Sequence, residues 1–82
     1  MIGPERSWAG ADLAGADLSG AILEGADFTN ANLRDANFRE SVAAGVRFDG
    51  ADLSGAFLAH SSFAECHMTR TRLAGVQAQV WS

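Results

Sequence analysis

A motif of five residues repeats along most of this 82-residue sequence. Segment 11–28 reads ADLAGADLSGAILEGADF, and cutting residues 11–75 into fives gives thirteen pentads without an insertion. The third position is Leu, Phe or Met in twelve of them, and the first position always holds a small or modest residue. Eight of the nine glycines occupy the fifth position. The fold must therefore accommodate one large apolar side chain every five residues.

Neither regular element of secondary structure has this period. Five residues advance a helix by about 500°, so successive third positions would rotate by about 140° and form no stripe. In a continuous strand, an odd repeat would alternate the large residues between opposite faces. Within one pentad, however, the first and third residues point to the same side of an extended segment, and a bend after them would turn the next pair inward again. The pattern predicts a chain that coils around its own apolar axis.

The repeat resembles the pentapeptide-repeat family, whose signature is A(D/N)LXX, over residues 11–75, and Trp8 keeps the phase one pentad earlier. The resemblance implies an all-β fold, a right-handed quadrilateral β-helix with four pentads per coil and the first and third residues inside. About four coils would make a rod on the order of 20 Å long, because stacked strands lie roughly 4.8 Å apart. We expect a single domain over 1–82, with 1–10 as an N-terminal cap and first partial coil and 76–82 as a C-terminal cap or association segment.

In such a coil, residues twenty positions apart should lie above one another. This arrangement sorts the third positions into a mostly aromatic column and an all-Leu column, which can pack in layers. Ala43 is the exception, and it would place a short residue next to Phe63. The predicted core consists of Trp8, Leu13, Leu18, Leu23, Phe28, Leu33, Phe38, Phe48, Leu53, Leu58, Phe63, Met68 and Leu73.

Composition and charge limit the classes of partner. Cys66 is the only cysteine, so no intrachain disulfide forms and the sequence is typical of a cytoplasmic protein. The apolar runs are too short for a membrane span, and MIGPERSW lacks the zones of a signal peptide. With a formal charge of −4 and no concentrated basic face, the chain should contact neither nucleic acid nor membrane directly.

The second position of the pentads, which should face solvent, is often Asp or Asn. These side chains can satisfy backbone groups at the bends. The alternative is an acidic face built from Asp12, Asp17, Asp27 and Asp52 that imitates a phosphate backbone, because the resemblance implies relatives that inhibit DNA gyrase or topoisomerase by DNA mimicry and protect against quinolones. Those relatives are longer rods with a dimerising C-terminus. Five exposed arginines weigh against mimicry here: Arg34, Arg39, Arg47, Arg70 and Arg72.

A second candidate surface is apolar. Ile22 and Val42 occupy second positions twenty residues apart, Ala44 and Ala64 should lie beside them, and Phe57 should project from the preceding face. Scattered exposed apolar residues are ordinary. A cluster on one side, in contrast, is typical of a partner or self-association surface. Both interpretations stay open at this point.

No arrangement typical of an active site is found in the sequence. His60 and His67 should face outward on different sides without aligned thiolates or carboxylates, so we expect no metal site. Cys66 takes an inward first position and should behave as a small buried hydrophobe. No phosphate loop, catalytic triad or paired catalytic carboxylates can be assigned. We therefore predict no enzymatic activity, no cofactor and no small-molecule substrate.

The two ends of a solenoid expose unpaired strand groups and apolar side chains, and each needs a cap or a partner. We expect Pro4 to stop pairing at the first coil, because proline lacks an N–H. We expect Val80 and Trp81 to cover the last coil or to join two molecules as an end-to-end homodimer. The sequence thus predicts a rigid structural or protein-interaction module, free or within a larger bacterial assembly, with a gyrase-directed DNA mimic as the alternative.

Overall fold

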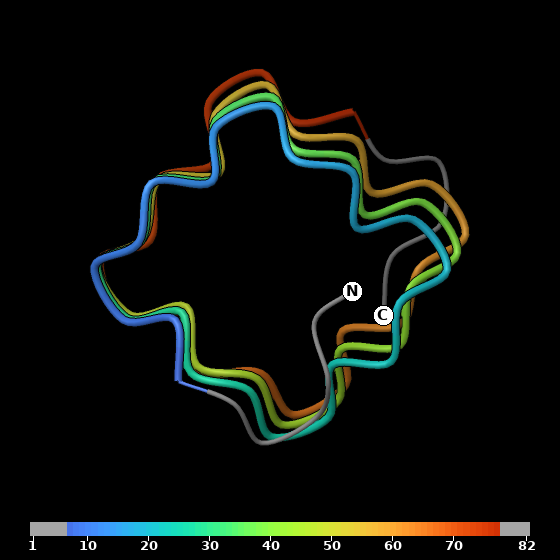
Figure 1. The fold of residues 1–82 in the computed structure, drawn as a ribbon, viewed down its shortest axis with the longest axis horizontal. Helices are drawn as coiled ribbons and strands as arrows, with labels where there is room; N and C mark the ends of the chain where they lie inside the picture. Colours follow the sequence, from blue (N-terminus) through green and yellow to red (C-terminus); the bar gives the residue numbers. More distant parts are fainter. Residues whose placement is uncertain (1–6, 78–82) are drawn as a thin grey trace.

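The computed structural model describes residues 7–77, and these residues contain neither a helix nor a strand longer than one bridging residue. Instead, every second position from Ser7 to Gln77 pairs in a parallel bridge with the residue twenty positions away. A shift of twenty residues between stacked five-residue units means that each turn of the chain holds four pentads. Viewed along the stack, successive turns lie over one another around a common centre, with four projecting corners (Figure 1). The right-handed winding and the number of coils stay predictions.

In the middle of the stack, the backbone N–H groups of each pentad donate three hydrogen bonds to neighbouring coils. The third-position N–H donates to a second-position carbonyl of the following coil, as from Leu33 to Asp52 at 2.8 Å. The fifth-position N–H donates to a fourth-position carbonyl of that coil, as from Asp35 to Ser54 at 3.0 Å. The second-position N–H donates to a first-position carbonyl of the preceding coil, as from Asp52 to Ala31 at 3.0 Å. These bonds fix the register at twenty residues.

Each pentad ends in a β-turn whose third residue is left-handed. The first-position N–H donates to the third-position carbonyl of the preceding pentad, as from Ala36 to Leu33 at 3.1 Å. The fifth position has a positive φ and the fourth does not, which is the pattern of a type II turn. Glycine takes this conformation without steric penalty, and it holds eight of these turns. Six turns are left-handed without glycine: Asn30, Asp35, Glu40, His60, Glu65 and Arg70.

The two kinds of turn predict opposite effects of substitution. Glu40 has a φ of 61°, so Glu40→Gly should relieve left-handed strain and raise the free energy of unfolding by up to about 1 kcal/mol. Gly45 has a φ of 71° and open space around its missing Cβ, so Gly45→Ala isolates the conformational penalty and should lower the free energy of unfolding by about 1 kcal/mol. Urea titration followed by circular dichroism measures both. Equal effects of the two variants would contradict the argument.

The interior of the coil is apolar and closely filled. Nine of the large third-position residues are buried: Leu18, Leu23, Phe28, Leu33, Phe38, Phe48, Leu53, Leu58 and Phe63. Trp8, Leu13, Met68 and Leu73 are only half-buried, and all four lie in the first or the last described coil, although Leu18, Leu23, Leu58 and Phe63 of the same coils are buried. Buried first positions are mostly alanine, which leaves room for the large neighbours.

Two buried first positions hold serine, and the hydroxyl group of each is hydrogen-bonded. The Ser41 hydroxyl donates to the Phe38 carbonyl at 2.7 Å, and the Ser61 hydroxyl donates to the Leu58 carbonyl. Each serine therefore bonds a carbonyl three residues earlier, at the same kind of turn. A hydroxyl buried without such a partner would cost roughly 1–3 kcal/mol, so the local turn makes serine acceptable at an alanine position.

Four phenylalanines form one cluster inside the coil. Phe28 and Phe48, twenty residues apart, stack with ring centroids 5.7 Å apart and planes inclined by 7°. Phe38 packs edge-on against Phe48 at 6.0 Å. Phe63 lies twenty residues after Ala43 in the same column, and its ring approaches Phe38 and Phe48 to 6.0 and 5.7 Å. The large residue of one coil thus fills the space that Ala43 leaves in the preceding coil.

Candidate interaction surface

All six Asp and Asn side chains of the second position hold the turn that follows them. In each case Oδ1 accepts a hydrogen bond from the backbone N–H two residues later, at distances from 2.9 to 3.4 Å. Within residues 7–77, no backbone carbonyl accepts from these fourth-position N–H groups. The side chains therefore satisfy backbone donors that the coil itself leaves unpaired, as the sequence predicts. They are Asp12, Asp17, Asp27, Asn32, Asn37 and Asp52.

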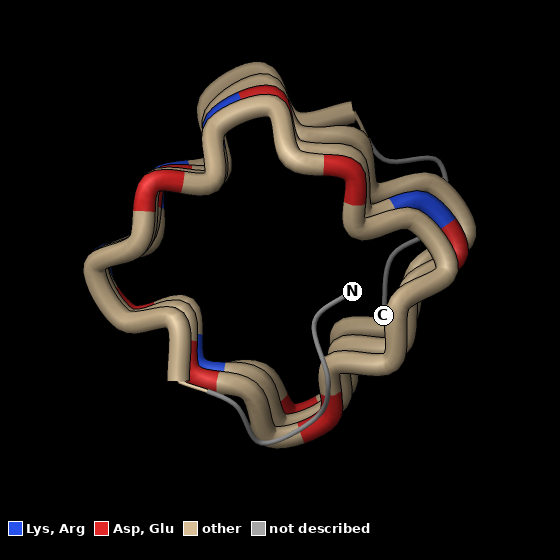
Figure 2. Tube along the Cα trace, viewed as in Figure 1, with Lys and Arg blue, Asp and Glu red and all other residues tan. Residues whose placement is uncertain are grey.

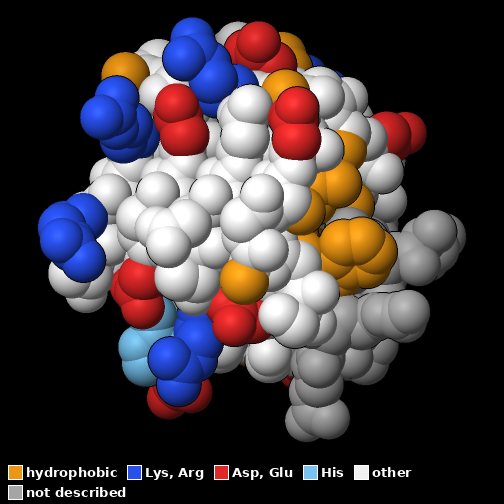
Figure 3. Space-filling model, turned by 60° about the vertical axis from the view of Figure 1, so that its left-hand side comes forward, with side chains coloured by type: hydrophobic (Ala, Val, Ile, Leu, Met, Phe, Trp, Pro, Cys, Tyr) orange, Lys and Arg blue, Asp and Glu red, His pale blue; other side chains and the backbone are white. Residues whose placement is uncertain are grey.

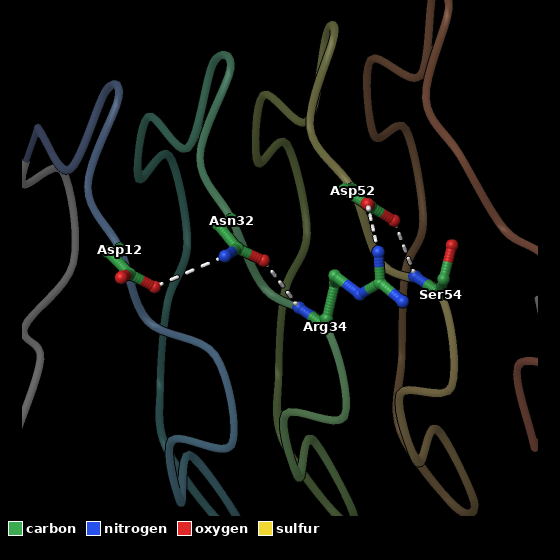
Figure 4. Close-up of polar contacts among 5 residues, drawn as sticks. All are labelled: Asp12, Asn32, Arg34, Asp52 and Ser54. Carbon is green, nitrogen blue, oxygen red and sulfur yellow. Dashed lines mark hydrogen bonds and ion pairs between the residues drawn. The ribbon is translucent and has the colours of Figure 1, made fainter.

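One side of the coil carries a polar column that links three turns of the chain (Figure 4). The Asn32 Nδ2 donates to Asp12 Oδ1 at 3.2 Å, in the preceding coil. Arg34 lies two residues after Asn32, and its Nη1 is 3.7 Å from Asp52 Oδ2 in the following coil. The Arg34 side chain is 61% exposed, so solvent screens this ion pair and its contribution to stability is at most about 1 kcal/mol.

The candidate acidic face does not form an unbroken stripe. Asp27 is bridged to Arg47, and Asp52 is bridged to Arg72, so a cation follows each of these acids in its column. Asp17 is bridged to the neutral Asn37. Figure 2 shows the acidic residues on several sides of the tube with arginines among them. The structure therefore does not gather the four predicted acids into one surface.

Hydrogen bonds lower the pKa of three of these carboxyl groups. The Ser19 hydroxyl and then its amide lower the pKa of Asp17, and the Thr29 hydroxyl and amide do the same for the pKa of Asp27. The hydroxyl and the amide of Ser54 lower the pKa of Asp52. In each case the ionised carboxylate is the form that accepts these bonds best.

These shifts predict a loss of stability in acid. Because the pKa in the folded chain lies below the unfolded value, the contribution is fully present above the unfolded pKa, near 4, and is lost as the pH falls through the folded pKa. The triple variant Asp17→Asn, Asp27→Asn, Asp52→Asn keeps an acceptor oxygen at each turn but does not titrate. Its melting temperature should fall less between pH 7 and acid than that of the wild type. An identical fall would contradict this assignment.

The apolar candidates lie mainly on another side, which we call the Ile22 side. It comprises the bridged column Ile22, Val42 and Ser62 together with the turn residues Ala44 and Ala64. Ile22 is 53% exposed and is the one large hydrophobic residue exposed to this degree within residues 7–77. Val42 and Ala44 are half-buried, and Ala64 is exposed. No second position of this column carries a charge among the described residues, but the exposed Glu24 stands two residues after Ile22, in the column of Ala44 and Ala64.

Phe57 does not belong to the Ile22 side. It lies in the column of Asn37 and Gln77, to which it is bridged. The guanidinium of Arg39 stands 4.4 Å from the centre of the Phe57 ring, a cation–π contact between consecutive coils. The ring is half-buried and partly covered by a charge, so the structure separates it from the other apolar candidates. Figure 3 shows hydrophobic groups gathered mainly toward the right of the visible surface, while the arginines lie mostly at its top and left.

Sequence reasoning missed the contacts between the turns of consecutive coils. Arg34 with Asp52 and Arg39 with Phe57 are both separated by eighteen residues, one coil minus two positions. The Asp49 carboxylate similarly accepts from the Thr69 N–H at 2.8 Å, twenty residues on. A search for pairs at these spacings would have found all three once the twenty-residue register was assumed.

The candidate chemical groups are dispersed. His60 and His67 are exposed, and no group of three or more His, Cys, Asp and Glu able to hold a metal ion occurs within residues 7–77. Cys66 is half-buried, where the sequence predicts a buried hydrophobe. Its Sγ donates to the Ala43 carbonyl at 2.8 Å, and burial raises the pKa of the thiol. Such a thiol is a poor nucleophile at neutral pH.

Pro4, Val80 and Trp81, the residues expected to cap or join the ends, lie outside the described residues. Their roles stay predictions. Within the part of the chain that the structure describes, no helix is long and apolar enough to cross a bilayer.

A parallel, twenty-residue register and an apolar axial core define a β-solenoid assembled from five-residue units. The sequence matches the profile of the pentapeptide repeats in eight copies, over residues 9–42 and 44–77. The chain therefore belongs to the pentapeptide-repeat family, as the A(D/N)LXX signature predicts.

Two solved structures show how far the similarity extends. A pentapeptide repeat protein from the thylakoid lumen of Arabidopsis thaliana superposes with a TM-score of 0.92 and 26% identity, over 96% of this chain and 55% of that one. Rfr23 from the cyanobacterium Cyanothece 51142 gives a TM-score of 0.65 and 27% identity, over 96% of this chain and 63% of that one. This chain thus spans less than two thirds of the length of either. No curated protein matches the sequence.

Proposed function

We propose that the chain is a rigid, non-catalytic interaction module that presents the Ile22 side to a protein partner. The observation that carries this proposal is the exposure of Ile22, 53%, in a protein whose other large hydrophobic residues within 7–77 are at least half-buried. An exposed aliphatic residue beside Val42 and two alanines provides a small apolar centre, and the polar turns around it supply a rim.

The hydrogen bonds of the polar groups support a structural role over a chemical one. The described second-position carboxylates and amides hold turns, and the buried serines bond local carbonyls. These groups are therefore engaged in maintaining the coil, and catalysis requires groups positioned toward a substrate. A right-handed coil in the cytoplasm remains our expectation for the whole module.

A pair of matched variants tests the Ile22 side. Ile22→Glu with Val42→Glu introduces two charges into the apolar column. Asn37→Asp with Gln77→Glu introduces two charges into a neighbouring column, and the carboxylate introduced at position 37 can still accept the hydrogen bond that holds the turn. In affinity capture from native cells, we expect the first variant to lose partners that both the wild type and the second variant retain. Equal capture by all three proteins, each shown to be folded by circular dichroism, would remove the Ile22 side as the contact surface.

A gyrase-directed DNA mimic is the alternative, and the arrangement of charges disfavours it. Mimicry needs successive negative charges, yet Arg47 and Arg72 interrupt the columns of Asp27 and Asp52. A supercoiling assay with purified gyrase and purified protein distinguishes the two functions. Inhibition that disappears in an Asp12→Asn, Asp17→Asn variant would favour mimicry over the interaction module.

A further inference from the structure

Charge is unevenly distributed around the coil, and the Ile22 side carries only acids and one histidine as ionisable groups. Three segments cross this side together with its two flanking turns: 20–25, 40–45 and 60–65. They contain no arginine or lysine, and their acids are three exposed glutamates, Glu24, Glu40 and Glu65, which we call the acidic rim. His60 is the other titratable residue in these segments. Each of the other three sides carries at least one exposed arginine within the described residues.

The acidic rim borders the apolar column on both edges. Glu24 stands two residues after Ile22, and Glu40 stands two residues before Val42. Two residues span at most about 7 Å of backbone, so each glutamate starts close to an apolar residue of the column. Glu65 belongs to the same stack of turns as Glu24, because backbone hydrogen bonds join these turns from coil to coil. A segment lying over the column would therefore meet negative charge on either hand.

The protein itself does not neutralise the acidic rim. Within residues 7–77, none of its three carboxylates forms a hydrogen bond or an ion pair, whereas the second-position aspartates hold turns. The arginines nearest along the chain are engaged elsewhere. The guanidinium of Arg39 stands over the Phe57 ring, and Arg47 is bridged to Asp27, whose negative charge it offsets. These glutamates are available for cations from outside.

This charge pattern restricts what can cover the apolar column. Nucleic acids and anionic lipid surfaces carry negative charge and would be repelled. A second copy docked symmetrically through the same side would bring the two acidic rims together, which like-charge repulsion disfavours. The remaining class of occupant brings an apolar side chain together with positive charge.

We propose that the Ile22 side binds a basic protein segment, which places an aliphatic or aromatic side chain against Ile22 and Val42 and lysines or arginines beside the acidic rim. This inference rests on the proposed function, since it uses the same side, and it adds the chemical class of the partner. The apolar contact removes Ile22 from water, and the charges select the partner and speed its encounter with the protein.

Selection of displayed random peptides against the full chain tests the partner class. We expect the enriched peptides to combine an aliphatic or aromatic residue with lysines or arginines. A fluorescently labelled copy of an enriched peptide is then titrated with the protein, and its anisotropy gives the affinity. Added salt should weaken binding to the wild type, because it screens the exposed charges.

Three variants, each shown to be folded by circular dichroism, separate the contributions to this affinity. Glu24→Gln, Glu40→Gln, Glu65→Gln should bind the peptide about tenfold more weakly and with less salt dependence, because three exposed charge interactions are lost. The matched control Asp12→Asn, Asp17→Asn, Asp35→Asn removes the same number of charges from other sides and should bind as the wild type does. Ile22→Ser, Val42→Ser removes the apolar contact without adding charge, uses the residue that Ser62 already places in this column, and should also bind about tenfold more weakly.

The outcomes distinguish this inference from the proposed function. Peptides that lose affinity for the serine variant but not for the glutamine variant would overturn the basic partner and leave the Ile22 side as a contact surface. Equal losses in the glutamine variant and its aspartate control would likewise overturn it, since net charge alone would then explain the effect. Peptides that bind the serine variant as tightly as the wild type would remove the Ile22 side itself. A selection that enriches no peptide would overturn the inference, and the partner-capture experiment would then decide the proposed function alone.

Discussion

Phe48→Ala should lower the free energy of unfolding by about 3–5 kcal/mol, the largest effect expected of any single substitution considered for this chain. Phe48 is fully buried, stacks on Phe28 at 5.7 Å and contacts two further rings. Removing it leaves a cavity at the centre of the aromatic cluster. Because a protein of this size has a total stability on the order of 5–15 kcal/mol, much of the population could unfold. Urea titration followed by far-UV circular dichroism measures the change.

Met68→Ala is the matched control for this variant. Met68 stands in the same column as Phe48, twenty residues on, but it is half-buried in the last described coil. Its truncation should therefore cost distinctly less than that of Phe48, since fewer neighbouring atoms lose contacts. Similar losses in the free energy of unfolding for the two variants would mean that Phe48, in the middle of the column, is no more tightly packed than Met68.

Ala43→Leu should destabilise the protein by about 1–3 kcal/mol, although it restores the apolar pattern of the repeat. Ala43 is fully buried, and the Phe63 ring of the next coil reaches Phe38 and Phe48 across the space that a leucine would need. A larger side chain must push that ring away or leave its own rotamer minimum. The free energy of unfolding from urea titration gives the size of the effect.

The double variant Ala43→Leu, Phe63→Leu tests the cause. Shortening Phe63 removes the ring that competes for the space, so the double variant should be more stable than the sum of the two single losses implies. Strictly additive losses would show that Phe63 does not compensate for Ala43. Stabilisation by Ala43→Leu alone would show that the site holds unfilled volume.

Three features of the structure could be predicted from the sequence, each from a different kind of information. The inward third positions followed from a period that helices and strands cannot satisfy, and the central ones are buried as that period requires. The twenty-residue register came with the family resemblance, and Asp52 bridged to Asn32 and to Arg72 shows it directly. The turn-holding role of Asp and Asn was available from their position and known turn chemistry.

Other features needed the coordinates. Six left-handed turns lack glycine, and nothing in Glu40 or Arg70 indicates a positive φ. The phase of the repeat already places Phe57 on the face that precedes the Ile22 side, but the contact that Arg39, eighteen positions away, makes with its ring needed the coordinates. Partner surfaces are likewise hard to assign from sequence, since the exposure of a residue depends on which side chain of a neighbouring coil covers it.

Sequence by itself determined the repeat, the family and which positions point inward, because a strict local period leaves the backbone few ways to bury a large residue in every fifth place. The tertiary structure alone decided how neighbouring coils share space and charge: Phe63 fills the volume beside Ala43, and Arg34 reaches Asp52. These contacts join residues eighteen or more positions apart, and their geometry exists only after the coils stack.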